Sequence, residues 1–494
     1  MNRLCGAALD ALPPDVFRPR YDRSATGIGV VHLGIGAFHR AHQAVYFDRV
    51  LGEEGGGWAI CGVSLRRRDV ADAMNPQDGL YTVLSRDAAA DRFDVIGSVR
   101  QVLFAPEDPV RVVDALSAPS TRIVSLTVTE KGYRHDPATG RLQPDHPEIV
   151  HDLAHPKAPR SAPGLLVAAL ARRRAAGLPP FTVLCCDNLP TNGRIAGGIV
   201  AALARAGDPA LADWIVETVP FPCTMVDRIV PAATDRERHL VREALGLEDR
   251  AAVVTEPFMQ WVVEDRFAQG RPNLAAVGVE LVEDVVPYET MKIRLLNGSH
   301  STLAYLGYLA GYAHIRDAMQ DQSFVRLMRL LMDRTVTPAL DVPVGYDIAA
   351  YKETLLERFA NPTLAHTTYQ IAMDGSQKLP QRFLETLAVC LERGIGFAPL
   401  ALALAGWMRY VIGRDEAGDP IAVQDPMADR LREIGADAGD DPATLVRAYL
   451  NISEIFPPAI AASERVATEV AEHLDSLLRI GARETVRAFV AGQD

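Results

Sequence analysis

The first half of the chain alternates short apolar runs with stretches whose apolar residues recur at helical spacing. The apolar runs have the length of strands and occupy 27–33, 58–63, 122–128 and 181–186. Helical spacing lies between them, for example at 163–176. Such alternation is typical of βαβ units, so we expect an α/β fold with a Rossmann-type doubly wound domain and a mostly parallel sheet.

The strand pattern fades after about residue 286, and the segments 324–332, 382–392 and 465–479 carry apolar residues at helical intervals. We therefore predict a Rossmann-type domain over 1–285 and a mostly α-helical domain over 286–494. A chain of 494 residues is long enough for two domains. Because ligands often bind in clefts between domains, we expect the active site between these two.

Composition and charge exclude several classes of protein. The net charge of −12 argues against a nucleic-acid partner, which needs a concentrated basic face. The six cysteines form no paired motif, so we expect neither disulfides nor a metal site, and a reducing, cytoplasmic setting. The N-terminus lacks the apolar run of a signal peptide, and the longest apolar stretch, 397–408, is too short to span a membrane. We read that stretch as a buried helix in a monomer or small homo-oligomer.

A glycine turn follows the first apolar run and precedes a helical run over 41–51. In a doubly wound fold the first glycine permits a tight turn and the second lets the backbone approach a pyrophosphate. His39 stands where a third glycine is usual, so a plain structural turn is the alternative. We expect a dinucleotide to bind here, with Arg40 as a nearby cation. The turn consists of Gly34, Ile35, Gly36, Ala37 and Phe38.

The residues after the second apolar run bear on the choice of dinucleotide. An acidic residue there binds the ribose hydroxyl of NAD, whereas an arginine accommodates the phosphate of NADP. Asp69 is acidic, but Arg66 and Arg68 precede it. We prefer NAD with Asp69 as its partner, and NADP stays open.

The segment 286–300 carries the most chemistry for its length. On an α-helix, Glu289, Lys292, Asn297 and His300 fall in one broad sector, and Arg294 lies about 200° from Lys292. A lysine desolvated in a cleft has a lowered pKa and suits a general base for alcohol oxidation. The alternative is a solvated amphipathic helix.

Two other enzyme classes compete with this interpretation. Tyr288 and Lys292 have the YxxxK spacing of short-chain dehydrogenases, but this chain is far longer and its turn reads GxGxF, so we regard the spacing as accidental. Zinc-dependent alcohol dehydrogenases are disfavoured because no closely spaced Cys, His and Glu ligands occur.

Two further polar clusters stand where ligands bind in such folds. Asn188 follows the run 181–186 and could donate to a developing alkoxide, or simply cap a loop. Asp227 and Arg228 are adjacent opposite charges, for which a surface ion pair is the plain interpretation.

Taken together, these motifs resemble the mannitol dehydrogenase family of long-chain, metal-independent polyol dehydrogenases. The resemblance implies a Rossmann domain, a helical C-terminal domain and NAD(H). It implies that Lys292 is the catalytic lysine, that Asn188 and Asn297 bind the reacting oxygen, and that His300 positions substrate. It further implies that Glu289 passes protons, and that Asp227 and Lys378 contact substrate. The blocks that carry it are 34–46, 125–133, 186–188, 224–234, 256–267 and 292–301.

Within the family, the block 366–382 is most similar to fructuronate reductases (D-mannonate oxidoreductases). Mannitol 2-dehydrogenases tend to carry an arginine near Gln370. A hexuronate needs a cation for its carboxylate, which Lys378 or Arg382 could supply, although Arg382 could also be a surface residue at a helix start. We expect interconversion of D-fructuronate and D-mannonate at C2. The alternatives are D-mannitol with D-fructose, a related polyol, and a non-catalytic NAD-binding regulator, which would not need Lys292.

Overall fold

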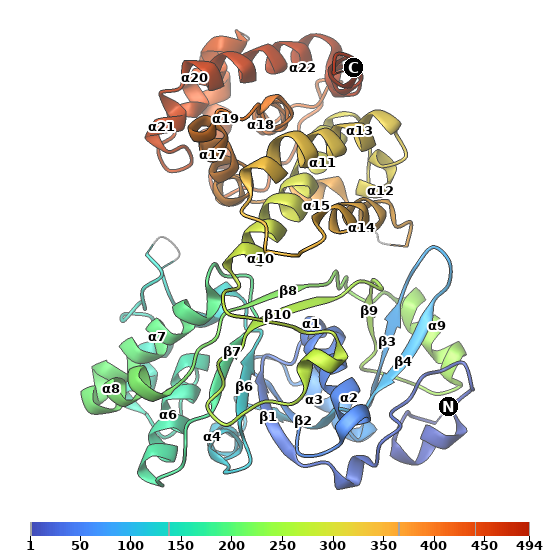
Figure 1. Cartoon of the computed structure of the whole chain (residues 1–494), viewed down its shortest axis with the longest axis vertical. Helices are drawn as coiled ribbons and strands as arrows, with labels where there is room; N and C mark the ends of the chain where they lie inside the picture. Colours follow the sequence, from blue (N-terminus) through green and yellow to red (C-terminus); the bar gives the residue numbers. More distant parts are fainter. Residues whose placement is uncertain (1, 137–138, 364–365, 440, 494) are drawn as a thin grey trace. The chain divides into compact units, whose positions relative to one another are not determined.

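The computed structural model describes residues 2–136, 139–363, 366–439 and 441–493. The chain divides into two compact units, Met1–Val286 and Pro287–Asp494 (Figure 1). The first unit contains all of the named strands, and the second is helical.

The first unit is built on a five-stranded sheet in the order β5-β2-β1-β6-β7. Every neighbouring pair in it is parallel. The order reverses between β1 and β6, and in doubly wound folds ligands bind outside the carboxyl ends of the strands at that point. The predicted fold class and the four predicted strands are confirmed. The strands are β1 (Ile28–Leu33), β2 (Ala59–Ser64), β5 (Val99–Phe104), β6 (Ile123–Leu126) and β7 (Thr182–Cys185).

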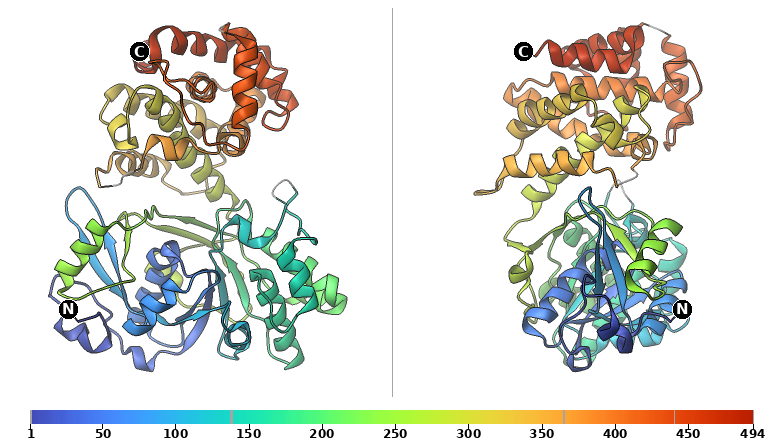
Figure 2. Two further views of the ribbon diagram at one scale, coloured as in Figure 1. Left: turned by 180° about the vertical axis from the view of Figure 1, so that it is seen from behind. Right: turned by 90° about the vertical axis from the view of Figure 1, so that its right-hand side faces the viewer.

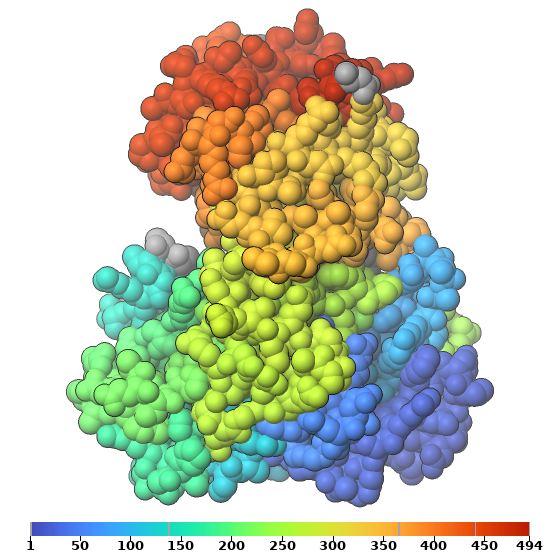
Figure 3. Space-filling view, in the orientation of Figure 1, coloured from blue at the N-terminus to red at the C-terminus, as the bar shows by residue number. Residues whose placement is uncertain are grey.

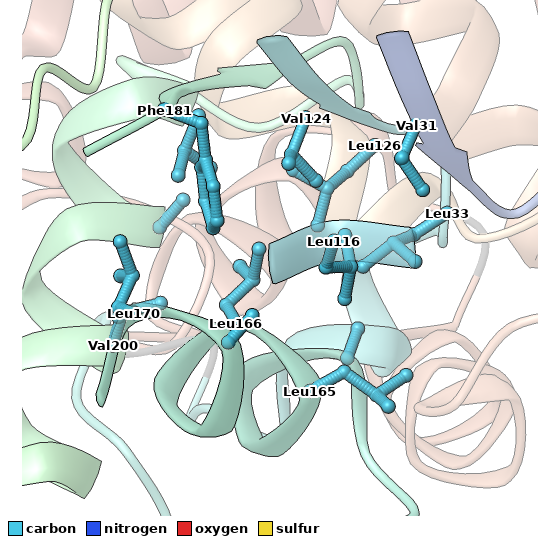
Figure 4. Close-up of a cluster of buried hydrophobic side chains, with 14 of the residues drawn as sticks. Val31, Leu33, Leu116, Val124, Leu126, Leu165, Leu166, Leu170, Phe181 and Val200 are labelled. Carbon is cyan, nitrogen blue, oxygen red and sulfur yellow. The ribbon is translucent and has the colours of Figure 1, made fainter. Parts of the chain in front are cut away.

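Helices cover both faces of this sheet (Figures 1 and 2). On one face, leucines of the helices pack on Val31, Val124 and Leu126 of the strands, as Figure 4 shows. Each fully buried leucine contributes roughly 1.5–3 kcal/mol to stability. The helices of this face are α4 (Pro109–Ser117), α6 (Ala162–Ala175), α7 (Asn192–Gly207) and α8 (Pro209–Thr218), and those of the other are α1 (Ala37–Ala41), α2 (Gln43–Glu54) and α3 (Asp69–Met74).

Two three-stranded sheets flank the parallel one and were not predicted. Each contains an antiparallel pair, β3 with β4 and β8 with β10. Several of these strands are short and buried on both sides, so they lack the alternation that marks a half-buried strand. The strands are β3 (Tyr81–Ser85), β4 (Arg92–Ile96), β8 (Thr224–Asp227), β9 (Val253–Thr255), β10 (Gln260–Glu264) and β11 (Glu280–Val282). The segment 266–285, yellow-green in Figure 3, lies largely at the surface of the first unit.

The second unit is a helical array centred on α18 (Ala398–Val411), which packs against α11 (Gly298–Leu309) and α22 (Glu464–Ala491). Pro399–Val411 are all buried, which confirms the helix expected over 397–408. No helix among the described residues is long and apolar enough to cross a membrane. The other main helices are α10 (Val286–Met291), α13 (Gln322–Leu330), α14 (Ile348–Ala360), α15 (Thr368–Ala372), α16 (Gly375–Leu379), α17 (Glu385–Arg393), α19 (Ala428–Ala438) and α20 (Pro442–Leu450).

Candidate active site

The two glycines of the turn after β1 have different surroundings. Gly34 has φ +94°, and a Cβ atom there would lie 2.2 Å from the carbonyl oxygen of Thr127, which follows β6. Only glycine fits this contact. A Cβ atom on Gly36, in contrast, would meet only the Gly34 carbonyl oxygen, at 3.8 Å. The backbone at Gly36 is therefore open to close approach, as pyrophosphate binding requires.

An imidazole stack explains why the third glycine is absent from the turn. His39 of α1 stacks on His32 of β1 with ring centroids 3.3 Å apart and planes 10° apart. His32 is held by the hydroxyls of Ser125, at 2.8 Å, and Thr127, at 2.9 Å. Burial lowers the pKa of His32 to about 3 and lowers that of His39, so both rings are neutral at pH 7. The stack fills the contact between helix and strand where the usual motif has glycine.

The remaining residues of the turn pack into the protein. Ile35 is buried, and its Cδ1 lies 2.1 Å from the Cβ position of Gly62 in β2, so glycine there makes room for it. Phe38 stacks on His42 with centroids 5.1 Å apart. Arg40 is buried, and its guanidinium donates to the carbonyls of Gly36, at 3.2 Å, and of Ala251. Arg40 thus stabilises the turn by hydrogen bonding to backbone carbonyls.

Asp69 lies at some distance along the chain from the strand that it was expected to follow. Strand β2 ends at Ser64, and Asp69 is the first residue of α3. Its half-exposed carboxylate is paired with Arg67. Arg68 is paired with Asp72 and Glu107. These ion pairs at the protein surface leave the role of Asp69 in nucleotide binding a prediction.

Asn188 is positioned by a buried carboxylate beside it. Asn188 itself is exposed and follows β7. The Asp187 carboxylate accepts hydrogen bonds from the backbone amides of Val128, at 3.0 Å, and Thr129, at 2.8 Å, and from the Tyr133 hydroxyl, at 2.7 Å. Burial raises the pKa of Asp187. The carboxylate therefore joins the ends of β6 and β7 and fixes the backbone from which Asn188 extends.

Thr129 is strained at this junction. Its φ of 63° and ψ of 162° lie in a region that is otherwise almost restricted to glycine and that costs of order 1–3 kcal/mol. The hydrogen bond from its amide to Asp187 helps to hold it there. Strain of this kind tends to lie at functional sites.

The interpretation of Asp227 and Arg228 as a surface ion pair is wrong, because both side chains are buried. Asp227 is the last residue of β8. Arg228 donates to the carbonyls of Glu256, at 3.0 Å, and Ala41, and burial lowers its pKa to about 10. Arg228 thus connects β8 to α1, and the role of Asp227 as a substrate contact stays a prediction.

In the second unit, Lys292–Asn297 form a π-helix between α10 and α11. The Gly298 amide donates to the carbonyl of Ile293, five residues earlier. The α-helical spacing that we assumed is therefore wrong here. In an α-helix a step of five residues ends about 140° past a full turn, whereas in a π-helix it makes about one turn. Lys292, which is buried, and Asn297 thus share one face more closely than predicted.

Arg294 points away from this face, as the spacing predicted. Its guanidinium donates to the Ala339 carbonyl, at 3.3 Å, and to Glu385 of α17, at 3.4 Å. Glu289 is half-buried on α10. The burial of Lys292 argues against a solvated amphipathic helix, which would leave the lysine in water.

His300 on α11 faces a group of aromatic and cationic side chains. Its ring lies 5.3 Å from that of Phe359 and 5.5 Å from that of His366. Its Nε2 atom is buried and has no hydrogen-bond partner among the described residues. Burial lowers the pKa of His300 most, and the neighbouring side chains of His366, Arg382, Arg358 and Lys378 lower it further. The ring is therefore neutral at pH 7, with Nε2 available for a ligand.

Arg382 and Lys378 lie on the π-helix Pro380–Leu384 and on α16. Arg382 is half-buried, which contradicts a surface role at a helix start, and it donates to the Ser301 hydroxyl at 2.8 Å and the Asn297 carbonyl at 3.5 Å. Burial lowers its pKa. Among the described residues no carboxylate pairs with it. The Lys378 ammonium donates to the Met373 carbonyl at 2.5 Å.

The sequence did not predict the roles of several residues near Asn188 and near His300. Asp187 and Thr129 lie in the motif blocks 186–188 and 125–133, but their hydrogen bond joins positions far apart in sequence. Arg358 and His366 carry no pattern that distinguishes them from structural residues. In the described ranges no cluster of three or more His, Cys, Asp or Glu side chains could hold a metal ion.

Comparison with known proteins finds the same family over both units. The model of the mannitol dehydrogenase Rossmann domain matches residues 28–276, and that of the mannitol dehydrogenase C-terminal domain matches residues 284–478. The D-mannonate oxidoreductase of Escherichia coli (strain K12) is 46% identical over 478 residues, which cover 96% of this chain and 98% of the relative. The uncharacterized oxidoreductase YeiQ of the same strain is 47% identical over 477 residues, 96% of this chain and 97% of its own.

A solved structure is similar over the same length. Mannitol 2-dehydrogenase of Pseudomonas fluorescens, in a ternary complex with NAD and D-mannitol, has a TM-score of 0.85 and 40% sequence identity. The alignment covers 99% of each chain.

Proposed function

Since the chain belongs to the mannitol dehydrogenase family of oxidoreductases, we propose that it interconverts D-fructuronate and D-mannonate with NAD(H). In this family we expect the YxxxK spacing of Tyr288 and Lys292 to be accidental. We expect the enzyme to act in the cytoplasm on a small sugar acid, as a monomer or small homo-oligomer, with no metal.

The observation that carries the choice of a sugar acid is the half-buried guanidinium of Arg382. Its described partners are a hydroxyl and a carbonyl, both neutral. A buried cation without an anion is costly, and a carboxylate is the ligand that a guanidinium binds most strongly. Lys378 adds a second positive charge, and both act on His300. A neutral polyol would bring no anion to the Arg382 guanidinium, whereas a hexuronate would bring its carboxylate.

The chain's own residues would divide the reaction as follows. The backbone at Gly34 and Gly36 would hold NAD(H), which would supply or accept the hydride. During reduction the amides of Asn188 and Asn297 donate to the C2 oxygen as negative charge develops on it. Lys292 holds the proton that this oxygen takes, and Glu289 restores it from solvent. His300, neutral at pH 7, positions the substrate hydroxyls through Nε2.

The glycine turn supports a dinucleotide as the cofactor. Its open backbone at Gly36 and the tight Gly34–Thr127 contact fit a bound pyrophosphate. We prefer NAD because the similar Pseudomonas fluorescens enzyme binds NAD. Arg66 and Arg68 keep NADP as the alternative cofactor.

The second candidate activity is oxidation of D-mannitol to D-fructose. It is favoured by the similarity to the Pseudomonas fluorescens enzyme, whose structure contains NAD and D-mannitol. A binding measurement separates the two. Calorimetric titration of the enzyme saturated with NADH should give a lower Kd for D-mannonate than for D-mannitol. A lower Kd for D-mannitol would contradict the sugar-acid proposal.

The lysine mechanism has its own test. Lys292→Ala should abolish turnover, and Tyr288→Phe should leave it nearly unchanged. If Tyr288→Phe alone abolished turnover, the short-chain mechanism would replace the one proposed.

A further inference from the structure

A second imidazole faces His300 in the helical unit. The His366 ring lies 5.5 Å from the His300 ring, with the two planes inclined by 34°. His366 is half-buried and stands just before α15. The family resemblance assigns no role to it, and nothing in the mechanism above uses it.

The backbone around His366 is firmly held. The Ile315 amide donates to the His366 carbonyl at 3.0 Å, and the Thr368 amide donates to the Ala313 carbonyl at 3.0 Å. His314 and Thr367 form an isolated antiparallel bridge. These bonds use the main chain, so the imidazole is presented from a fixed position without being part of the hydrogen bonding that holds it.

Positive charge surrounds the two imidazoles. Arg358 is buried on α14, and the next residue, Phe359, contacts the His300 ring. Burial and then the charge of Arg358 lower the pKa of His366, which keeps this ring neutral. The cations Arg382, Arg358 and Lys378 all lower the pKa of His300. The positive charges near the two rings therefore come from two parts of the chain, Arg358 of α14 and the segment 378–382.

A carboxylate can accept hydrogen bonds at about four positions. A single guanidinium fills about two of them in a bidentate pair, so further donors are needed for the others. A neutral imidazole offers one N–H donor, and the positive potential favours a negatively charged acceptor over a neutral hydroxyl. We propose that His366 is a specificity-determining residue that donates to the carboxylate of the sugar-acid substrate, with the charge of Arg358 supporting it. This inference rests on the proposed function, which supplies the carboxylate.

The experiment compares two substrates with two variants. We would measure kcat and KM for D-fructuronate and for D-fructose with wild-type enzyme, His366→Ala and His366→Gln. For D-fructuronate, His366→Ala should lower kcat/KM by about 10- to 100-fold, the usual effect of losing a hydrogen bond to a charged group. The loss should fall on KM. For D-fructose the change should stay within about 3-fold, and His366→Gln, which keeps an N–H donor, should recover part of the loss.

A matched control is available on α22. His473 is also half-buried in the helical unit, and it packs edge-on against Phe489, 5.4 Å away. His473→Ala removes a comparable imidazole and should leave both substrates unaffected. Thermal melting of each variant separates loss of folding from loss of recognition. If His366→Ala does not fold, His366→Phe, which keeps a ring but has no N–H donor, decides the case, and an inhibition constant of D-mannonate equal to that of wild type would overturn the proposal.

The failures are distinguishable. An equal loss with both substrates would show that His366 positions any sugar, and no loss with either would show that it does not touch substrate. Both outcomes overturn the inference and leave the proposed function intact. If wild-type enzyme prefers D-fructose, the proposed function itself fails, and the inference fails with it.

Discussion

Replacing each glycine of the turn by alanine should have a different effect, because the added Cβ atom meets different surroundings at Gly34 and at Gly36. Gly34→Ala would place Cβ 2.2 Å from the carbonyl oxygen and 2.8 Å from the carbonyl carbon of Thr127. Those are backbone atoms, and Thr127 is fixed by the hydrogen bond that its backbone amide donates to the Leu33 carbonyl at 3.0 Å. Relieving the contact requires a backbone shift of about 1 Å at the ends of β1 and β6, which core packing resists. The positive φ adds about 1–3 kcal/mol of strain.

We therefore expect Gly34→Ala to lower the free energy of unfolding of the first unit by about 2–4 kcal/mol and to weaken NADH binding by at least about 10-fold. Gly36→Ala is the control. Its φ of −82° suits alanine, and the new Cβ meets no atom closer than 3.8 Å, so stability should change by less than about 0.5 kcal/mol.

The assays are urea denaturation and titration of NADH against protein fluorescence. Gly36→Ala should still bind NADH at least about 10-fold more weakly, because its methyl group occupies the space that the pyrophosphate needs. Wild-type stability in Gly34→Ala would refute the packing argument. Wild-type NADH affinity in Gly36→Ala would refute the placement of the cofactor.

Three further predictions concern other parts of the site. Arg382→Met should lower kcat/KM for D-fructuronate by about 10- to 100-fold and that for D-fructose by only a few-fold, and equal losses in steady-state assays would contradict a carboxylate contact. Asp187→Asn leaves at least one of the Val128 and Thr129 amides without an acceptor, so the free energy of unfolding should fall by about 1–3 kcal/mol in urea denaturation, and kcat should fall too. Unchanged values would contradict a role of Asp187 in positioning Asn188. Burial lowers the pKa of His32 from the ordinary 6.5 to about 3 in the folded protein, so the unfolded chain binds a proton first as the pH falls. The free energy of unfolding should therefore fall by about 2 kcal/mol between pH 7 and pH 5. His32→Gln should reduce this dependence on pH, and an unchanged dependence would contradict the assignment.

Local patterns in the sequence predicted the features that depend on local chemistry. The strand runs, the glycine turn and the apolar helix α18 each follow from periodicity or from a residue type with a restricted role. The direction of Arg294 also followed, because a step of two residues on a helix places side chains well apart whether the helix is α or π.

Features that depend on distant contacts could not be predicted in this way. The π-helix at Lys292–Asn297 has the same apolar pattern as an α-helix, and only its backbone hydrogen bonds distinguish it. The burial of Arg228 depends on carbonyls of Ala41 and Glu256, which no spacing near Arg228 reveals. The strands β8 and β10 are buried throughout and so lack alternation.

The candidate site divides along the same line. Lys292, Asn297 and His300 stand close in sequence and were predicted together. The group around His300, in contrast, gathers the cations Arg358 and Arg382 and the imidazole of His366 from separate segments, and their common surroundings appear only in the folded unit. The sequence therefore predicted Lys378 and Arg382 as candidate cations, but not the surroundings that they share with His300.

The most direct test of the account is the rate of NADH oxidation with D-fructuronate and with D-fructose, measured side by side and repeated with NADPH. We predict a much larger kcat/KM for D-fructuronate, with NADH preferred over NADPH. A larger kcat/KM for D-fructose would contradict the assignment of a sugar-acid substrate and would make this member of the family a polyol dehydrogenase.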